Sequence, residues 1–200
     1  MKRLLITQRV DYISERNEMW EGVDISLSKL VSRMGFLPLL VSSAVVDKVS
    51  YIKELAPDAI LLTGGSDIGS SKDRDKLEFA LLDYAKKLNL PVFGICRGME
   101  VLNVYQGGSL SSITGHVSTR HFISGSLFPH GREVNSFHNI AILPENLGLK
   151  LDILAKASDG SIEAMRHFSL PWLAVMWHPE REVNANFGDW KMIKEHLDKN

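Results

Sequence analysis

The sequence is poor in the features that mark secreted, membrane-spanning or nucleic-acid-binding proteins. One cysteine occurs in 200 residues, so no disulfide can form within the chain. The formal net charge of -1 gives no general attraction to nucleic acid or to an anionic membrane. No apolar run approaches the roughly 20 residues of a membrane span, and the basic start lacks the apolar core of a signal peptide. These absences predict a cytoplasmic protein whose partner is a small molecule.

What is present is an ordinary globular composition. The chain is 44% hydrophobic and 24% charged, which suits a folded domain with a sizeable core. We find no internal repeat, low-complexity tract or linker. Residues 1–200 are therefore predicted to form a single domain.

The first half of the chain alternates short apolar runs with segments of helical periodicity. Strands are predicted for residues 2–8, 36–41, 58–63 and 90–95, and helices for residues 17–34, 45–55 and 73–88. Residues 173–177 predict a last buried strand. This alternation favours an α/β fold with a mainly parallel central sheet and helices on both faces.

The pattern changes after residue 108. Short apolar segments at 109–113, 121–127, 133–137 and 141–143 are separated by Gly, Ser and Pro. They predict a small additional β element, either a smaller mixed sheet or a hairpin appendage.

Cys96 lies at the junction of a predicted strand and a predicted helix. Gly94 and Gly98 flank it, as a sharp strand-to-helix turn requires. Such a turn holds its apex side chain at a helix N-terminus, which favours an anion and predicts a lowered thiol pKa. A lone cysteine is often an inert core residue, but this setting favours a nucleophile.

Two further strand ends could meet Cys96, because ligands bind beyond the carboxyl ends of parallel strands. His178 follows the last predicted strand and could take the thiol proton, with Glu180 orienting its imidazole. The backbone N–H groups of Gly65 and Arg97 could form an oxyanion hole. The alternative is a flavodoxin-like domain whose glycines serve turns and whose histidine is structural.

Several motifs together resemble one family. The segments LLTGGSD, PVFGICRGMEVLN, GGSL, VNSFH, SDGSIEA and VMWHPE are similar to those of class I glutamine amidotransferases, in the branch that contains the γ-glutamyl hydrolases. The resemblance implies the three-layer amidotransferase fold, with Cys96 as nucleophile, His178 as base and Glu180 as its partner. It implies a γ-glutamyl thioester that water resolves, and a glutamyl pocket lined by Ser136, Phe137 and His138. No cofactor is implied, and no Cys or His cluster has metal-ligand spacing.

The departures from the family concern the substrate. Glu100 stands where the family usually has Gln, either to meet the substrate's ammonium group or as a tolerated change. The loop after Gly65 is short, which suggests an open pocket for a bulky leaving group. Basic residues in segments that could rim this pocket are Lys72, Arg74, Arg97, Arg120 and Arg132. They could bind phosphates or be solvated. His121 and His167 are interpreted as structural or surface residues.

Three functions remain open for such a protein. The first is hydrolysis of a γ-glutamyl amide, with a nucleotide-linked, polyamine or GABA-type leaving group. The second is a glutaminase component that passes ammonia to a separate synthetase. The third is a non-catalytic member of the same fold, which the intact Cys, His and Glu set disfavours.

Overall fold

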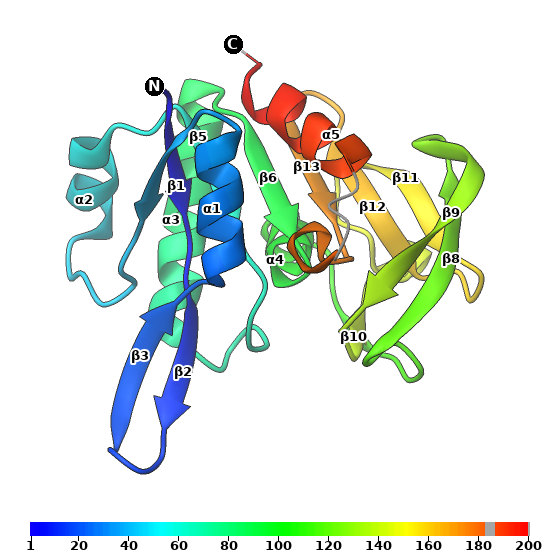
Figure 1. Cartoon of the computed structure of the whole chain (residues 1–200), viewed down its shortest axis with the longest axis horizontal. Helices are drawn as coiled ribbons and strands as arrows, with labels where there is room; N and C mark the ends of the chain where they lie inside the picture. The colour runs from blue at the N-terminus through cyan, green and yellow to red at the C-terminus, as the bar shows by residue number, and fades with distance from the viewer. Residues whose placement is uncertain (183–186, 200) are drawn as a thin grey trace.

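A long mixed sheet runs through the centre of the protein (Figure 1). The computed structural model describes residues 1–182 and 187–199, and nine strands from this part of the chain form that sheet. Their order is β4 (Leu37–Leu40), β1 (Arg3–Ile6), β5 (Ala59–Leu62), β6 (Val92–Ile95), β13 (Trp172–Val175), β12 (Ile162–His167), β11 (Leu151–Ala157), β8 (Thr119–Gly125) and β9 (Phe128–Ser136). The strands from β4 to β13 pair in parallel, and those from β12 to β9 are added antiparallel.

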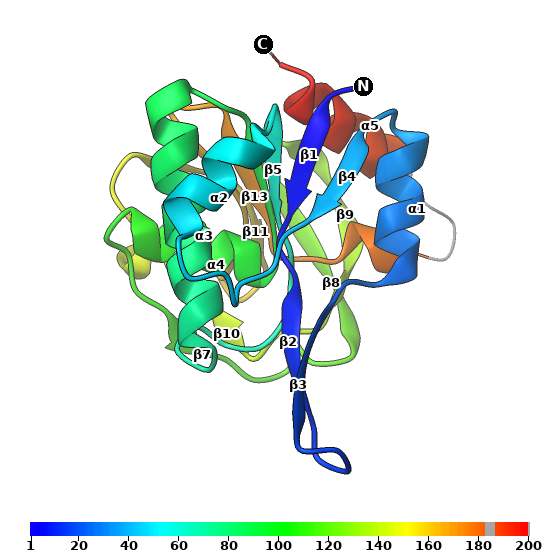
Figure 2. The same ribbon diagram turned by 90° about the vertical axis from the view of Figure 1, so that its left-hand side faces the viewer.

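Helices cover both faces of the parallel half, as Figure 2 shows edge-on. One face carries α1 (Ile25–Arg33) and α5 (Phe187–Leu197), and the other carries α2 (Lys48–Leu55), α3 (Lys72–Leu88) and α4 (Arg97–Tyr105). The predicted three-layer α/β architecture is confirmed. No described helix has the length and apolar character that crossing a membrane requires.

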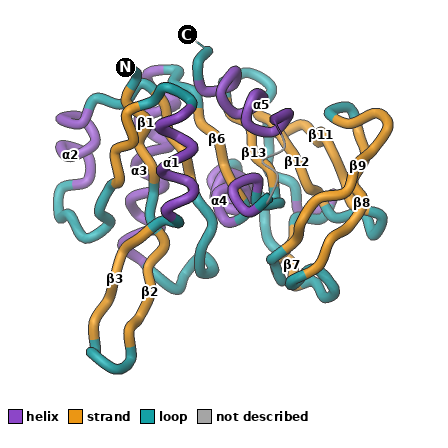
Figure 3. Tube along the Cα trace, viewed as in Figure 1, coloured by secondary structure: helices purple, strands orange, loops and turns teal. Residues whose placement is uncertain are grey.

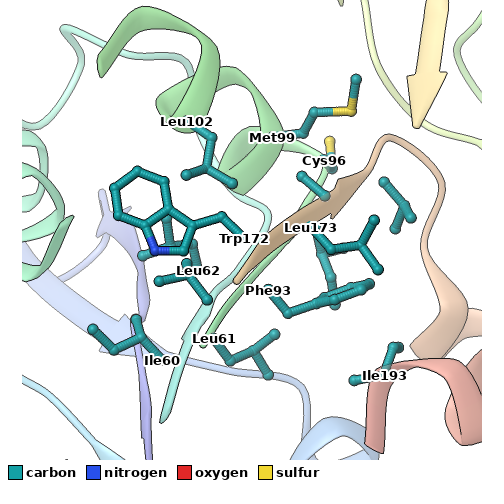
Figure 4. Packing of buried hydrophobic residues seen from close by; sticks show 14 of the residues in the cluster. Ile60, Leu61, Leu62, Phe93, Cys96, Met99, Leu102, Trp172, Leu173 and Ile193 are labelled. Carbon is teal, nitrogen blue, oxygen red and sulfur yellow. The ribbon is translucent and has the colours of Figure 1, made fainter. Parts of the chain in front are cut away.

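Burial on both faces explains the composition of the central strands. All residues of β5, β6 and β13 are buried, so these strands are continuous apolar runs without polar alternation. Figure 4 shows Phe93, Trp172 and Leu173 packed between strands and helices, with Cys96 at the upper edge of this core. The catalytic candidate is thus held at the edge of the buried core.

The prediction of one helix over residues 17–34 was wrong in its first part. Residues 9–22 form a hairpin of β2 (Arg9–Ile13) and β3 (Glu18–Gly22), which projects from the body in Figure 3. Helix α1 begins only at Ile25, where the Asp24 carboxylate accepts a hydrogen bond from the Ser26 N–H. The helical spacing had combined exposed hairpin residues such as Trp20 with the buried face of α1.

The strands after residue 108 do not form one separate sheet. Strands β8 and β9 extend the central sheet, because β8 pairs with β11 through Ile123 and Ala157. A separate two-stranded pair joins β7 (Ser111–Ser112) to β10 (Ile140–Ala141). The described chain is completed by two 3-10 turns, η1 (Pro144–Asn146) and η2 (Pro179–Arg181).

Candidate active site

Cys96 occupies the strained turn that the sequence predicts. Its φ of 50° and ψ of -108° lie where residues other than glycine are rare. The flanking glycines are required because a Cβ at Gly98 would lie 2.3 Å from the Leu62 carbonyl oxygen, and one at Gly94 would lie 2.7 Å from the Gly98 carbonyl carbon. The prediction of an elbow between β6 and α4 is confirmed.

The prediction of a lowered pKa for the Cys96 thiol is wrong. Burial and, after it, the negative charge of Glu100 raise the pKa of Cys96 to about 12, and the backbone N–H of Arg97 opposes them only in part. Desolvation therefore outweighs the helix N-terminus here. The thiol is neutral at pH 7, and its attack on a carbonyl group requires a base.

His178 and Glu180 lie together at the end of β13. Glu180 Oε1 is 2.6 Å from Nδ1 of His178, whose side chain is buried, while that of Glu180 is 9% exposed. Asn135 fixes the backbone of His178, since its amide donates to the His178 carbonyl and its oxygen accepts from the His178 N–H, both at 2.8 Å. Asn135 belongs to the VNSFH motif, but its contribution to this site was not predicted.

Gly64 brings the end of β5 against both groups. A Cβ at Gly64 would lie 2.8 Å from Cε1 of His178 and 3.7 Å from Cβ of Cys96. Gly65 has a φ of 148°, and a Cβ there would lie 2.2 Å from Nη1 of Arg74. Strands β5, β6 and β13 are consecutive in the sheet, so their ends deliver these residues side by side.

A cavity of about 560 Å³ contains the three strand ends. Cys96, His178 and Glu180 line it, together with residues 63–66. Its outer wall comes from segments to which the sequence analysis assigned no site role. Arg9 and Asp11 of β2 line it, as do the start of α1 and Arg181 after the histidine. The hairpin was missed as part of the site because half of it was predicted to be helical.

The three predicted glutamyl-binding residues differ in whether their side chains reach the cavity. Phe137 lines the cavity, and its ring centroid lies 5.8 Å from that of His178. The Ser136 hydroxyl donates to the His116 carbonyl instead, and His138 Nδ1 donates to the Ile140 carbonyl. Neither of these two side chains lines the cavity over the described residues.

Glu100 lies behind the elbow, within α4. Its side chain is buried, and burial raises its pKa to about 7, although the positive charge of Arg97 opposes this shift. The carboxylate is near enough to Cys96 to raise the thiol pKa. Its effect on the site is therefore electrostatic in this structure.

Arg97 and Arg74 serve the scaffold beneath the elbow. The Arg97 guanidinium pairs with Glu78 and Asp75, and Arg74 binds Glu78 at 2.9 Å. Arg74 also donates to the carbonyl oxygen of Gly64 at 3.0 Å. These buried ion pairs join α3, α4 and the β5 loop.

The other predicted cations lie away from the cavity. Arg120 pairs with Glu133 and Glu182, and Arg132 pairs with Asp189. As far as the chain is described, none of Lys72, Arg74, Arg97, Arg120 and Arg132 lines the cavity, and the cations that do are Arg9 and Arg181.

Comparison with known proteins decides the family. The model of the Peptidase C26 family matches residues 6–180, which include all three strand ends. The chain belongs to the peptidase C26 family. Membership implies an amide hydrolase of the glutamine amidotransferase type, and it confirms the resemblance drawn from the motifs.

Individual relatives agree with this family assignment. The γ-glutamyl-CDP-amidate hydrolase of Campylobacter jejuni is 33% identical over an alignment 205 residues long, gaps included. The alignment covers 95% of this chain and 98% of that protein. A solved structure from Thermoplasma acidophilum, assigned as a component of GMP synthase, has a TM-score of 0.73 at 18% identity and covers 98% of this chain and 93% of its own. A glutamine amidotransferase structure from Thermotoga maritima has a TM-score of 0.68 at 13% identity, covering 98% and 84%. These two structures support the fold.

Proposed function

We propose that this protein hydrolyses a γ-glutamyl amide through a thioester on Cys96, with His178 as base and Glu180 as the group that orients it. The observation that carries the proposal is the cavity that Cys96, at its strained elbow, lines together with the hydrogen-bonded pair of His178 and Glu180. Because the thiol is neutral, a base must take its proton as the sulfur attacks the carbonyl carbon.

The reaction follows from this arrangement in two halves. Cys96 Sγ bonds to the γ-carbonyl carbon as its proton passes to Nε2 of His178, the nitrogen left open by Glu180 at Nδ1. The C–N bond then breaks, and His178 returns the proton to the departing nitrogen. Water, activated by the same imidazole, attacks the thioester, releases glutamate and restores the thiol.

The N–H groups of Gly65 and Arg97 are proposed to hold the oxyanion. Gly65 lies in the cavity wall at the end of β5, and the Arg97 N–H already interacts with the thiol. Removal of one such donor typically costs about 2.7–4 kcal/mol of barrier. Phe137 is proposed to contact the glutamyl part of the substrate.

The proposed leaving group is a nucleotide diphosphate linked through nitrogen, as in γ-glutamyl-CDP-amidate. The relative of that name supports this substrate, because its similarity extends over nearly the whole chain. Two guanidinium groups in the cavity wall support it as well, because they suit a diphosphate. Arg181 packs over the Phe137 ring at 4.7 Å, and Arg9 is held by Asp11 at 2.6 Å.

A γ-glutamyl polyamine is the second candidate substrate. The same wall carries the carboxylates of Asp11 and Asp24, which would attract a cationic leaving group. The two candidates therefore differ in which charges of the wall bind the leaving group.

The test compares glutamate release from γ-glutamyl-CDP-amidate, γ-glutamyl-putrescine and glutamine. We expect the nucleotide substrate to be cleaved fastest, and Cys96→Ala to abolish release while the circular dichroism spectrum is retained. Arg9→Ala should raise KM for this substrate about tenfold, as loss of a charged hydrogen bond implies. Arg16→Ala, at the tip of the same hairpin, is the control.

Other outcomes separate the alternatives. Faster cleavage of the putrescine amide would select the second candidate, and glutamine turnover that needs an added synthetase would indicate an ammonia-delivering component. Activity retained in Cys96→Ala would overturn the thioester mechanism.

A further inference from the structure

Three histidines and one glutamate meet at a second place in the protein, which we call the histidine cluster. His116 precedes β8, His121 lies on β8, His138 follows β9 and Glu163 lies on β12. Glu163 is fully buried, and His116 and His138 are 6% and 5% exposed. None of the four lines the cavity at Cys96 in the described part of the chain.

The separations within the cluster are close to those of ligands around a metal ion. His116 Nδ1 and His138 Nε2 are 3.3 Å apart, and Glu163 Oε1 lies 3.5 Å from the latter and 3.9 Å from the former. Ligands on a tetrahedral zinc ion lie about 3.3–3.4 Å apart, because the bonds are about 2.0–2.1 Å long. His121 Nε2 lies 3.3 Å from the second Glu163 oxygen, Oε2.

Hydrogen bonds outside the cluster fix which nitrogens face inward. His138 Nδ1 is 2.8 Å from the Ile140 carbonyl oxygen, which can only accept, so Nδ1 carries the hydrogen. His116 Nε2 is 2.7 Å from the carboxylate of Asp159 and carries its hydrogen for the same reason. In the neutral rings, the two nitrogens that face each other are therefore both acceptors. Such outer partners are typical of metal-binding histidines.

The cluster therefore presents converging acceptors with no donor between them. Neither Glu163 oxygen, nor either ring nitrogen of His121, has a well-aligned hydrogen bond among the described residues. Glu163 is fully buried, and its Oε1 lies 3.5 Å from Nε2 of His138 and 3.9 Å from Nδ1 of His116. A buried anion among acceptors requires a cation.

We propose that the histidine cluster binds one divalent metal ion, with His116 Nδ1, His138 Nε2 and Glu163 as ligands and His121 beside the fourth position. Two imidazoles and a carboxylate suit Zn²⁺ among the available metals. A proton is the competing cation. A single proton would pair at most two of the converging atoms, whereas a metal ion would bind all three.

The site would join segments that are far apart in the chain. It would tie Glu163 on β12 to His116, before the start of β8, and to His138, after the end of β9. His138 directly follows Phe137, which contacts His178. The ion is therefore expected to stabilise this side of the cavity wall without taking part in the chemistry at Cys96.

Metal binding is tested on the whole chain with Co²⁺, whose visible absorption reports its coordination. Metal-free protein should bind one Co²⁺ per chain, show tetrahedral d–d bands and gain thermal stability, and Zn²⁺ should displace the colour. The same spectrum is expected in Cys96→Ala, because a site made by Cys96 and His178 would lose its binding there.

Asp159→Asn is the most discriminating variant, because Asp159 is partly exposed and lies outside the ligand set. The Asn amide would donate to His116 Nε2 and move the ring hydrogen to the metal-facing Nδ1. We expect Co²⁺ affinity to fall about 10–100-fold. Asp152→Asn, on the exposed face of β11, is the matched control and should bind normally.

The proposal is overturned if the wild-type chain neither retains metal after purification nor gains stability and colour with Co²⁺. Equal affinity in Asp159→Asn and wild type would also overturn it. Glu163→Gln should abolish binding. If that variant does not fold, the exposed Asp159→Asn variant decides the question.

Discussion

Glu180 Oε1 lies 2.6 Å from Nδ1 of His178, although the two residues are separated only by Pro179. The 3-10 turn η2 begins directly after His178 and turns the Glu180 carboxylate back to the ring. Both side chains thus come from the same strand end. Because a carboxylate accepts, this proximity favours the tautomer with the hydrogen on Nδ1, in which Nε2 is the acceptor.

Glu180→Gln is expected to lower kcat roughly 10²–10⁴-fold with little change in KM. The amide would donate to Nδ1 and favour the tautomer in which Nε2 carries the hydrogen and cannot act as a base. Steady-state kinetics with the γ-glutamyl substrate measures this. Glu133→Gln, an exposed acid on β9, is the control. Full activity in Glu180→Gln would remove this residue from the mechanism.

Gly64→Ala is expected to reduce turnover far more than it reduces stability. The added Cβ would lie 2.8 Å from Cε1 of His178, so the ring must shift away from its position beside Cys96. Displacements of about 1 Å can cost on the order of 100-fold in rate. Gly22→Ala, in the same cavity wall, is the control because nothing lies within 4 Å of its added Cβ. Equal loss in both variants would contradict the steric argument.

Glu100→Gln is expected to make stability less dependent on pH. Burial raises the pKa of Glu100 from 4.5 to about 7 in the folded state. The folded state therefore keeps a proton that the unfolded state loses between those values, and wild-type stability falls as the pH rises through this window. The neutral amide removes the penalty, so the variant should gain roughly 2–3 kcal/mol over wild type by pH 8. Urea unfolding at pH 4.5 and pH 8 measures the difference, and a constant difference would contradict the shift.

The same variant should make the thiol more reactive. The charge of Glu100 contributes to the raised pKa of Cys96, after burial. Its removal lowers that pKa, so iodoacetamide should alkylate Cys96 faster in Glu100→Gln than in wild type at pH 8. Glu54→Gln, on the exposed face of α2, should alkylate at the wild-type rate. A slower reaction in Glu100→Gln would show that another group controls the thiol.

The sequence was sufficient where a feature depends on neighbours along the chain. The elbow at Cys96 needs Gly94 and Gly98, all within five residues, and the buried strands before it were visible as apolar runs. His178 and Glu180 were predicted because they directly follow such a run. The parallel sheet then brings these separate ends together by a general rule of the fold.

What the sequence could not supply depends on contacts between distant segments. The hairpin at residues 9–22 exposes Trp20, so its apolar residues imitated a helix face. The thiol pKa follows from burial, which no local pattern measures. The histidine cluster combines His116, which precedes β8, with Glu163, which lies 47 positions later on β12, so no ligand spacing existed to be found.

Glu78→Ala is expected to cost about 3–5 kcal/mol of stability, because it leaves two buried guanidinium groups without their shared carboxylate. Arg74 and Arg97 both pair with Glu78, and all three side chains are buried beneath the elbow. Urea unfolding should show this loss, and catalysis should fall with it as the loop at Gly64 loosens. Glu195→Ala, which breaks an exposed pair with Lys191, should cost less than about 1 kcal/mol. Similar losses in the two variants would mean that the network under Cys96 adds no more than a surface ion pair.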